Sequence, residues 1–235
     1  MKIAMWSGPR NLSTAMMYSF AARSDCAVWD EPFYAAYLAK TGLNHPMHDE
    51  IMQTGEQDAA KVAARCGYEN PNGKAHFYQK HMTQHMIDGV DRSWMSQVKN
   101  VFLIRHPARV IASYAKKRQG PTLDDIGFWQ QVELFAACDN PIVIDSHDIR
   151  ENPKAMLRTL CHALDLSFDP AMLSWPAGGH ADDGVWASHW YGAVHRSTGF
   201  AGAEGELPQL TGDYLDLSNQ ALPYYKRLAA AKISL

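Results

Sequence analysis

Short, almost continuous apolar runs alternate along this chain with longer segments of helical periodicity. The apolar runs predict strands at residues 2–6, 26–29, 76–79, 101–104 and 142–144. Runs without interspersed polar residues are typical of strands that are buried on both faces, and strands separated by helices are typical of a parallel sheet. The pattern therefore predicts an α/β domain with a central, mostly parallel sheet of about five strands.

The segments of helical periodicity predict helices at residues 13–22, 108–117, 123–138, 153–164 and 219–231. Two segments show no clear period. Residues 38–74 are polar and predict a mobile cover or a small helical insertion. Residues 175–210 contain many glycines and predict a long loop region, and long loops in compact domains are often functional. We expect one domain over residues 1–235, with these two segments covering the site.

Composition and charge exclude several classes of protein. The chain carries 22 Lys and Arg against 25 Asp and Glu, a net charge of −3, which excludes a strongly basic nucleic-acid binder. No apolar run approaches the roughly 18 residues of a membrane-spanning helix, and the first apolar run ends at Ser7-Gly8-Pro9, too early for a secretion signal. The four cysteines form no C-x-x-C pair, as expected of reduced thiols. We expect a cytoplasmic protein without nucleic-acid or membrane partners, of unknown oligomeric state.

The first predicted strand runs into a turn that favours an anion. A strand, a turn of small residues and a helix N-terminus follow one another in Ser7-Gly8-Pro9-Arg10-Asn11-Leu12-Ser13-Thr14. Unpaired N–H groups and the positive end of the helix dipole meet in such a turn, and Arg10 adds a charge. The alternative is a plain helix cap by Ser13 or Thr14, with Arg10 in solvent. The turn lacks the second Gly and the Lys of a nucleoside-triphosphate loop, which disfavours chemistry on Mg-ATP or Mg-GTP.

A second candidate site follows the strand predicted at residues 101–104. Arg105 stands at the carboxyl end of this strand, where open α/β sheets bind ligands. Ser113 falls about two turns along the next helix and can share a face with Arg109. A guanidinium at a strand end suits a phosphate. The alternative is an ordinary salt bridge of Arg105 and a buried Ser113 bonded to its own helix.

These motifs together resemble the P-loop sulfotransferase superfamily. Arg105 and Ser113 are similar to its 3′-phosphate-binding Arg and Ser, and the turn at residues 9–14 is similar to its 5′-phosphosulfate loop, usually P-K-S-G-T-T. A third block, residues 142–166, resembles its Y-E-D-L…P…L-x-x-L…F-L-G-L segment. The resemblance implies a P-loop NTPase-like three-layer α/β/α fold. It also implies transfer of a sulfuryl group from 3′-phosphoadenosine 5′-phosphosulfate to a hydroxyl or amine of a small-molecule acceptor.

The resemblance also implies which residues bind this donor. They are Gly8, Pro9, Arg10, Asn11, Leu12, Ser13 and Thr14, then Arg105 and Ser113, and finally Arg196, Ser197 and Phe200 from a basic, glycine-containing loop. Arg10 replaces the usual Lys. Ala15 and Ser146 stand where relatives carry aromatic residues near adenine, so Phe200 or Tyr191 would have to stack on the base.

Two residues compete for the role of general base toward the acceptor. Glu31 ends the second strand, in Asp30-Glu31-Pro32, where some relatives have a similar Glu-Pro. His81 follows Lys80 after the third strand, where other relatives have a catalytic His close to a Lys. We favour Glu31 and assign Lys80 a possible contact with the sulfate. Otherwise Glu31 caps a helix or pairs with Arg10, and His81 lies at the surface.

Other candidate residues carry weaker signals. The pairs His81 and His85, and His45 and His48, lack a third ligand at a recognisable spacing, so no metal is expected. The aromatic residues of the loop region, Trp175, Trp186, Trp190 and Tyr191, form either an acceptor pocket or packing for the loop. Two other functions remain open: a small-molecule kinase of the P-loop class, and a nucleotide-binding protein without turnover.

Overall fold

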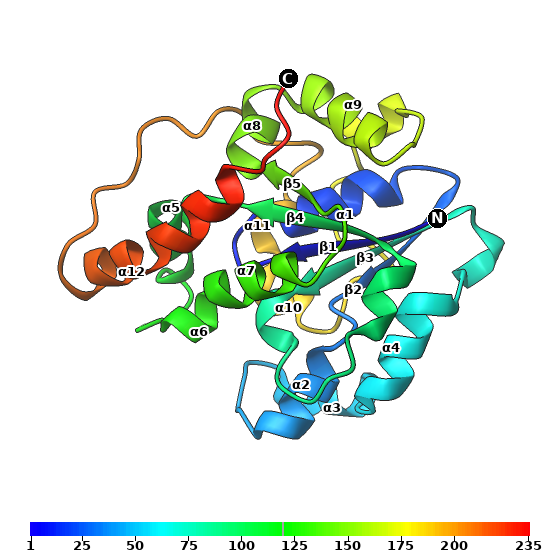
Figure 1. Cartoon of the computed structure of the whole chain (residues 1–235), viewed down its shortest axis with the longest axis horizontal. Coiled ribbons are helices and arrows are strands. Elements are labelled where there is room, and N and C mark those ends of the chain that lie inside the picture. The colour runs from blue at the N-terminus through cyan, green and yellow to red at the C-terminus, as the bar shows by residue number, and fades with distance from the viewer. Residues whose placement is uncertain (119) are drawn as a thin grey trace.

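The computed structural model describes residues 1–118 and 120–235 and is built around one parallel sheet. Its strands are β1 (Lys2–Ser7), β2 (Cys26–Asp30), β3 (His76–Met82), β4 (Lys99–Ile104) and β5 (Ile142–Asp145). All four pairings are parallel, in the order β2-β3-β1-β4-β5 (Figure 1). The five strands predicted from the apolar runs are therefore confirmed, in one sheet of the predicted kind.

Helices cover both faces of the sheet. They are α1 (Ser13–Ala21), α2 (Tyr34–Thr41), α3 (His48–Thr54), α4 (Ala59–Tyr68), α5 (Pro107–Tyr114), α6 (Leu123–Ile126), α7 (Phe128–Ala136), α8 (Ser146–Glu151), α9 (Pro153–Ala163), α10 (Ala187–Trp190), α11 (Gly192–His195) and α12 (Gly212–Ala229). Apolar side chains of α1 and α9 pack on one face, and those of α4, α7 and α12 on the other. The fold has the three α/β/α layers that the sequence predicts.

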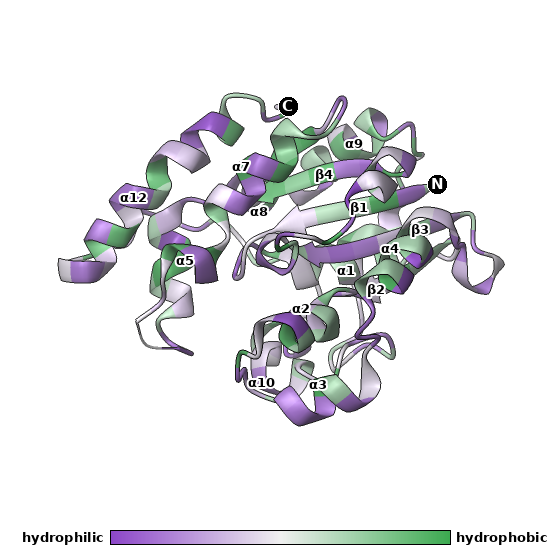
Figure 2. Ribbon diagram, turned by 60° about the horizontal axis from the view of Figure 1, so that its bottom comes forward, coloured by the Kyte–Doolittle hydropathy of each residue, from purple (hydrophilic) through white to green (hydrophobic). Residues whose placement is uncertain are grey.

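Successive side chains of a strand point to opposite faces of the sheet. In β1, Ile3 and Met5 face α1 and α9, whereas Ala4 and Trp6 face the opposite layer. Both sets are apolar because both faces are covered. Figure 2 shows β4 hydrophobic over most of its length, whereas β3, on the other side of β1, carries the hydrophilic run Gln79-Lys80-His81. Polar side chains inside a buried strand require hydrogen-bond or ion-pair partners. In β3, Lys80 has these partners in the candidate active site.

The helix predicted at residues 123–138 is in fact two helices. Gly127 lies between α6 and α7 with φ = 70°. A Cβ at this position would approach Thr83 Oγ1 to 2.6 Å, so both the left-handed backbone and the close packing require glycine. The predicted helix at 108–117 ends earlier, at Tyr114, and the one predicted at 219–231 begins earlier, at Gly212. Gly212, a poor helix former at the first position, hid the start of this last helix from the sequence pattern, whereas Pro223 lies inside the part that the pattern predicts.

The two irregular segments pack against each other beside the sheet. Residues 38–74 contain the end of α2 and all of α3 and α4, so this segment is largely helical. Residues 175–210 are mostly loop, with the short helices α10 and α11. Apolar residues of both segments, together with Tyr34 and Ala35 just before the first one, form one cluster: Leu38 and Ile51 with Trp186, Ala187 and Tyr191. Figures 1 and 2 show α2, α3 and α10 close together, beyond β2.

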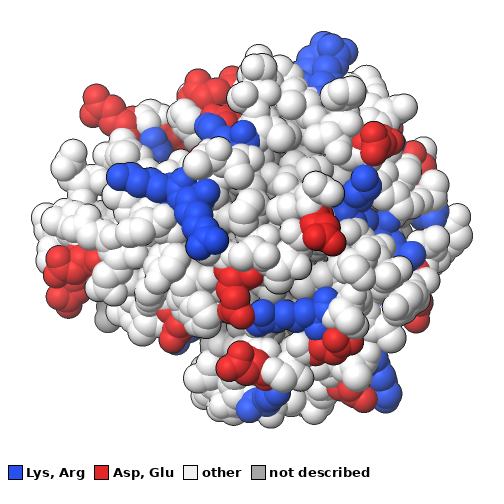
Figure 3. All heavy atoms as spheres, viewed as in Figure 1, with Lys and Arg blue, Asp and Glu red and all other residues white. Residues whose placement is uncertain are grey.

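Acidic and basic residues are interspersed over the face drawn in Figure 3, in keeping with the small net charge. In the part of the chain that the structure describes, no helix combines the length and the apolar character needed to cross a bilayer.

Candidate active site

A cavity of about 350 Å³ opens at the carboxyl ends of the strands. Each of the five strands contributes the chain that follows it, or its own end, to the wall. The lining includes Pro9 to Ala15, Glu31, Lys80, Met82, Arg105, Ser113, Ser146, Arg150, Tyr191, Ser197 and Glu204. Most of the residues predicted from separate motifs are thus brought into one cavity.

The loop at residues 7–14, where the sequence predicts anion binding and which we call the anion loop, has an unusual backbone. Arg10 and Leu12 adopt φ angles of 62° and 71°, a left-handed conformation that non-glycine residues seldom take. Leu12 stands where the P-K-S-G-T-T pattern has its Gly, the residue that adopts a left-handed conformation at the least cost. It is also the N-cap of α1 and provides no side-chain hydrogen bond. The predicted alternative, a cap by Ser13 or Thr14, is wrong, and the first-turn residues of α1 line the cavity instead.

Gly8 fixes the loop against its neighbours. A Cβ at Gly8 would lie 2.3 Å from the carbonyl oxygen of Ile126, so only glycine allows this approach. Asn11 Nδ2 donates to the Leu103 carbonyl over 3.3 Å and ties the loop to β4. The loop therefore rests on the backbone of two other segments.

Arg10 and Ser113 meet in the cavity. Arg10 Nε donates to Ser113 Oγ over 2.9 Å, so this serine contacts Arg10 directly. Arg105 Nη1 donates to the Arg10 carbonyl over 2.6 Å. Burial, and then the positive charge of Arg105, lower the pKa of Arg10. Two guanidinium groups held this close favour an anionic ligand.

Arg105 belongs to a larger cluster at the same end of the cavity. Glu204 accepts hydrogen bonds from Arg105 and from Arg150 Nη1, the latter over 2.8 Å, and Arg109 Nε lies 3.1 Å from Glu204 Oε2. Burial raises the pKa of Glu204, but the neighbouring arginines outweigh it and hold the pKa below its usual range. Arg150 and Glu204 were missed by the sequence analysis. The place of Arg150 just after β5 is the signal that could have revealed it.

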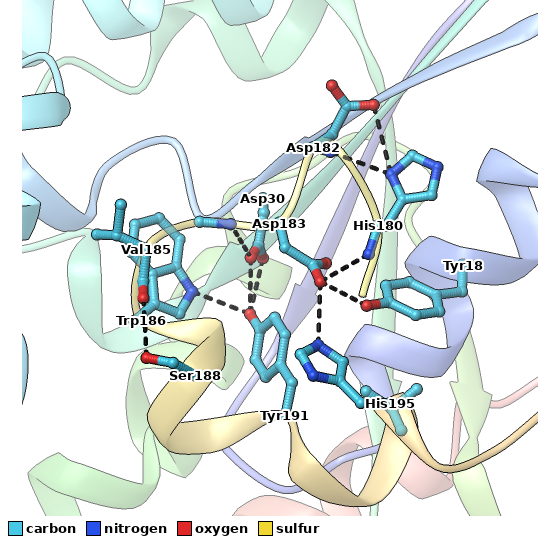
Figure 4. Close-up of polar contacts among 12 residues, drawn as sticks. Tyr18, Asp30, His180, Asp182, Asp183, Val185, Trp186, Ser188, Tyr191 and His195 are labelled. Atoms are coloured by element: carbon cyan, nitrogen blue, oxygen red, sulfur yellow. Dashed lines mark hydrogen bonds and ion pairs between the residues drawn. The ribbon is translucent and has the colours of Figure 1, made fainter. Parts of the chain in front are cut away.

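Glu31 lines the cavity as part of a buried polar network. Lys80 Nζ donates to Glu31 Oε1 over 2.5 Å, to Asp30 Oδ1 over 2.8 Å and to the Tyr191 hydroxyl over 2.6 Å. The Tyr191 hydroxyl lies 2.8 Å from Asp30 Oδ2 and 3.2 Å from Glu31 Oε1 (Figure 4 shows the contact with Asp30). Trp186 Nε1 donates to the same hydroxyl over 3.0 Å. All three Nζ hydrogens of Lys80 are thus used within the protein, and Glu31 pairs with Lys80 and not with Arg10.

The two charges of this network depend on each other. Burial raises the pKa of Glu31, and the positive charge of Lys80 opposes that effect. Burial would lower the pKa of Lys80, but the carboxylates of Asp30 and Glu31 outweigh it and raise the pKa. Glu31 also has a φ of 41°. Strained backbone of this kind persists where the surroundings hold it, often at functional sites.

A second carboxylate anchors the loop that carries Tyr191. Asp183 Oδ2 accepts from the Tyr18 hydroxyl over 2.5 Å and from the backbone N–H of His180 over 2.9 Å, and it lies 3.1 Å from His195 Nε2 (Figure 4). The backbone N–H of Gly184 donates to Asp30 over 3.1 Å. Asp30 and Asp183 therefore hold the 180–195 segment over the sheet edge.

His81 lies outside the cavity lining. It is 2% exposed, stacks on Trp6 with ring centroids 4.4 Å apart, and its Nε2 lies 3.1 Å from Gln79 Oε1. Burial, and then the charge of Lys80, lower its pKa to about 3. Strand alternation turns Lys80 toward the cavity and His81 toward the other layer. The alternative that places His81 at the surface is wrong.

Arg196 and Phe200 are also absent from the described residues that line the cavity. Phe200 packs edge-on against Trp175, with ring centroids 5.2 Å apart. Of the predicted C-terminal loop, Ser197 reaches the wall, together with Gly199 and Ala201. Trp175 and Trp186 serve packing, whereas Trp190 and Tyr191 line the cavity.

The opposite end of the cavity is aromatic. The His85 ring stacks on Tyr34 and Tyr37 at centroid distances of 4.6 and 4.8 Å, and the Tyr34 hydroxyl lies 3.0 Å from His45 Nδ1. Burial lowers the pKa of His45 and of His85 and so favours their neutral imidazoles. Among residues 1–118 and 120–235, no group of three or more His, Cys, Asp or Glu side chains is arranged to hold a metal ion.

The comparisons with known proteins agree with this geometry. The family profile "Sulfotransferase domain" matches residues 1–232. The chain therefore belongs to the sulfotransferase-domain family. Among solved structures it resembles the sulfotransferase domain from the curacin biosynthetic pathway, with a TM-score of 0.53, 16% identity and coverage of 95% of this chain and 97% of that one. This likeness shows the fold. The sulfotransferase domain of the Synechococcus PCC 7002 olefin synthase aligns with a TM-score of 0.49 and 17% identity, covering 93% of each chain.

Two curated relatives come from Arabidopsis thaliana. They are named branched-chain-amino-acid aminotransferase-like proteins 1 and 2, and each is 36% identical to this chain over 230 residues, or 96% of its length. The alignment covers only 41% of either relative, so this chain spans about two-fifths of their length.

Proposed function

We propose that this protein transfers the sulfuryl group of 3′-phosphoadenosine 5′-phosphosulfate to a hydroxyl group of a small-molecule acceptor. The observation that carries the proposal is one cavity that holds an arginine-bearing anion loop and, on its wall, the buried carboxylate of Glu31. The family match supports sulfuryl transfer. The two halves of the cavity correspond to the two substrates of such a reaction.

The donor end suits a ligand with two separated anionic groups. Arg10 and the α1 amides would hold the 5′-phosphosulfate, and Arg105 with Ser113 the 3′-phosphate. Ser146 Oγ and Arg105 Nε are buried at this end and have no hydrogen-bond partner among the described residues. Buried donors without partners are costly, and a ligand rich in oxygen atoms would satisfy them. The loop lacks the Gly-Lys of triphosphate-binding P-loops, which disfavours a kinase.

The residues of this chain supply three parts of the reaction. Glu31 accepts the proton of the acceptor hydroxyl as the acceptor oxygen bonds to sulfur and the bond from sulfur to the phosphate oxygen breaks. Arg10 and the loop amides stabilise the charge that develops on that leaving oxygen. The donor supplies the sulfuryl group. Adenosine 3′,5′-bisphosphate and the sulfated acceptor leave, and the proton stays on Glu31 until solvent removes it.

Lys80 acts through Glu31, in place of the direct contact with sulfate expected from the sequence. Its three hydrogens are directed to Asp30, Glu31 and Tyr191, so none is left for a ligand. Lys80 and Tyr191 are therefore positioning residues, which fix the direction and the proton affinity of the Glu31 carboxylate. His81 is not proposed as the base, because it is buried away from the cavity lining and kept neutral.

The acceptor would bind against the aromatic end of the cavity. Tyr34 supplies an aromatic wall there, and the imidazoles of His45 and His85 supply hydrogen bonds without charge. Such a wall suits an uncharged hydroxyl compound.

The test compares Glu31→Gln with the wild-type protein. We expect the change to lower sulfuryl transfer from labelled donor to a panel of phenols and primary alcohols by about 100-fold or more, since a general base typically contributes this much. Affinity for adenosine 3′,5′-bisphosphate, measured by calorimetry, should stay unchanged. Glu69→Gln, an exposed residue at the end of α4, is the matched control. Full transfer by Glu31→Gln would overturn the assignment of the base.

A further inference from the structure

Glu204 is an unexpected occupant of the donor end of the cavity. It belongs to the extended segment between α11 and α12, residues 199–211, which we call the strap (Figure 1). Residues 201–203 and 205–207 of the strap are exposed, whereas the Glu204 side chain is only 1% exposed. The strap therefore inserts one carboxylate into the protein, and it does so at Arg105.

The contacts of Glu204 are those of a phosphate site. Three guanidinium groups, those of Arg105, Arg109 and Arg150, surround its carboxylate. Arg109 Nη1 also donates to the Glu204 carbonyl over 3.0 Å, and Arg150 Nε donates to the Gly202 carbonyl over 2.8 Å. A cluster of arginines that donates to clustered oxygens is suited to a phosphate monoester, which carries more charge and one more oxygen than a carboxylate.

The carboxylate of Glu204 balances only part of the positive charge at this site and leaves some hydrogen-bond donors without an acceptor. Three positive charges face one negative charge. The buried Ser146 Oγ and Arg105 Nε line the same cavity and find no hydrogen-bond partner among the residues that the structure describes. A dianion would compensate the charge better and offer acceptor atoms for the remaining donors.

We propose that Glu204 is an internal competitor for the 3′-phosphate of the donor, so that the nucleotide has to displace this carboxylate from the three arginines in order to bind. The inference rests on the proposed function. Release of Glu204 would also free the strap, because Arg109 and Arg150 hold its backbone as well as its carboxylate. Donor binding is thereby coupled to movement of the segment that leads into α12.

The expected effect on affinity follows from the population of the competent state. If Glu204 occupies the site most of the time, the apparent dissociation constant is the intrinsic one divided by the fraction of open sites. Glu204→Gln keeps the shape of the side chain and removes its charge. We expect it to bind adenosine 3′,5′-bisphosphate about tenfold more tightly than the wild type does. Affinity for AMP, which has no 3′-phosphate, should not change.

The experiment is calorimetric titration of the wild type, Glu204→Gln and Glu206→Gln with both nucleotides. Glu206 is an exposed carboxylate of the same strap and serves as the matched control. Tighter binding of the bisphosphate by Glu204→Gln alone supports the inference. Equal affinity in all three proteins, or weaker binding by Glu204→Gln, overturns it and leaves the donor site standing. If no variant binds the bisphosphate, the proposed function fails, and this inference fails with it.

A second measurement on the wild type removes the dependence on a variant. Cleavage of the strap by a protease should become faster when adenosine 3′,5′-bisphosphate is bound, because the carboxylate is released. AMP should leave the cleavage rate unchanged. Slower cleavage with the bisphosphate would mean that the strap closes on the nucleotide, which contradicts competition.

Discussion

Glu31 and Lys80 are 9% and 1% exposed, and neither charge would persist at that depth without the other. A lone buried charge is costly, and removing one member of a buried pair leaves the other uncompensated. Asp30 and Tyr191 complete the network, so a positive charge, two carboxylates and a hydroxyl share one site. In this arrangement the proton affinity of Glu31 depends on each neighbour.

Tyr191→Phe tests this dependence. The hydroxyl of Tyr191 lowers the pKa of Glu31, because it donates to the charged form. Its removal takes one hydrogen bond from the charged carboxylate and so raises the pKa of Glu31. A base acts when deprotonated, so the acid limb of kcat/KM should move to higher pH.

The control for this prediction is Tyr18→Phe. The Tyr18 hydroxyl donates to Asp183, outside the Glu31 network, so this variant should leave the acid limb in place. A limb that stays in place with Tyr191→Phe would mean that a group other than Glu31 sets the pH dependence.

At the scale of elements, the site depends on how α6 and α7 support the anion loop. The carbonyl of Ile126, at the end of α6, approaches Gly8, and Thr83 Oγ1 donates to the Gly127 carbonyl over 2.9 Å. Gln131 of α7 donates to the Trp6 and Leu103 carbonyls over 3.1 and 3.0 Å. The break between α6 and α7 at Gly127 therefore supports the anion loop from below.

Gly127→Ala should destabilise the protein more than Gly42→Ala does. Both glycines have φ near 70°, and a Cβ there costs about 1 kcal/mol from conformation alone. Gly42 has open space around it, whereas a Cβ at Gly127 meets Thr83 Oγ1 at 2.6 Å. We expect Gly127→Ala to lose about 2–4 kcal/mol of unfolding free energy, measured by urea denaturation. Equal losses in the two variants would contradict the packing described here.

Sequence periodicity revealed the strands and the anion loop because both are local. An uninterrupted apolar run such as Val101-Phe-Leu-Ile104 has few other uses in a folded chain. The ends of the helices were less predictable. A single glycine such as Gly127 does not by itself interrupt a helical pattern, and only its left-handed backbone and its contact with Thr83 show why the helix breaks there.

At the scale of the whole molecule, the site consists of contacts between residues far apart in sequence. Lys80 and Tyr191 are 111 positions apart, and Arg105 and Glu204 are 99 positions apart. No periodic pattern in one sequence links such pairs, so the contacts of Tyr191 with Lys80 and of Glu204 with Arg105 became visible only in the fold. The burial of His81 has a related reason, because its neighbours on the opposite face of the sheet come from two distant parts of the chain, Trp6 of β1 and Trp94 before β4.

The central claim is that this cavity binds a nucleotide with a 3′-phosphate, held by Arg105. Calorimetric titration should show tight binding of adenosine 3′,5′-bisphosphate without magnesium, and much weaker binding of AMP and of ATP with magnesium. Arg105→Ala should weaken binding of the bisphosphate by about 10- to 100-fold, as expected for lost charge-assisted hydrogen bonds, and leave AMP nearly unaffected. Arg227→Ala, an exposed arginine of α12, should change neither affinity. Preference for ATP with magnesium, or equal losses for the bisphosphate and AMP in Arg105→Ala, would contradict the account.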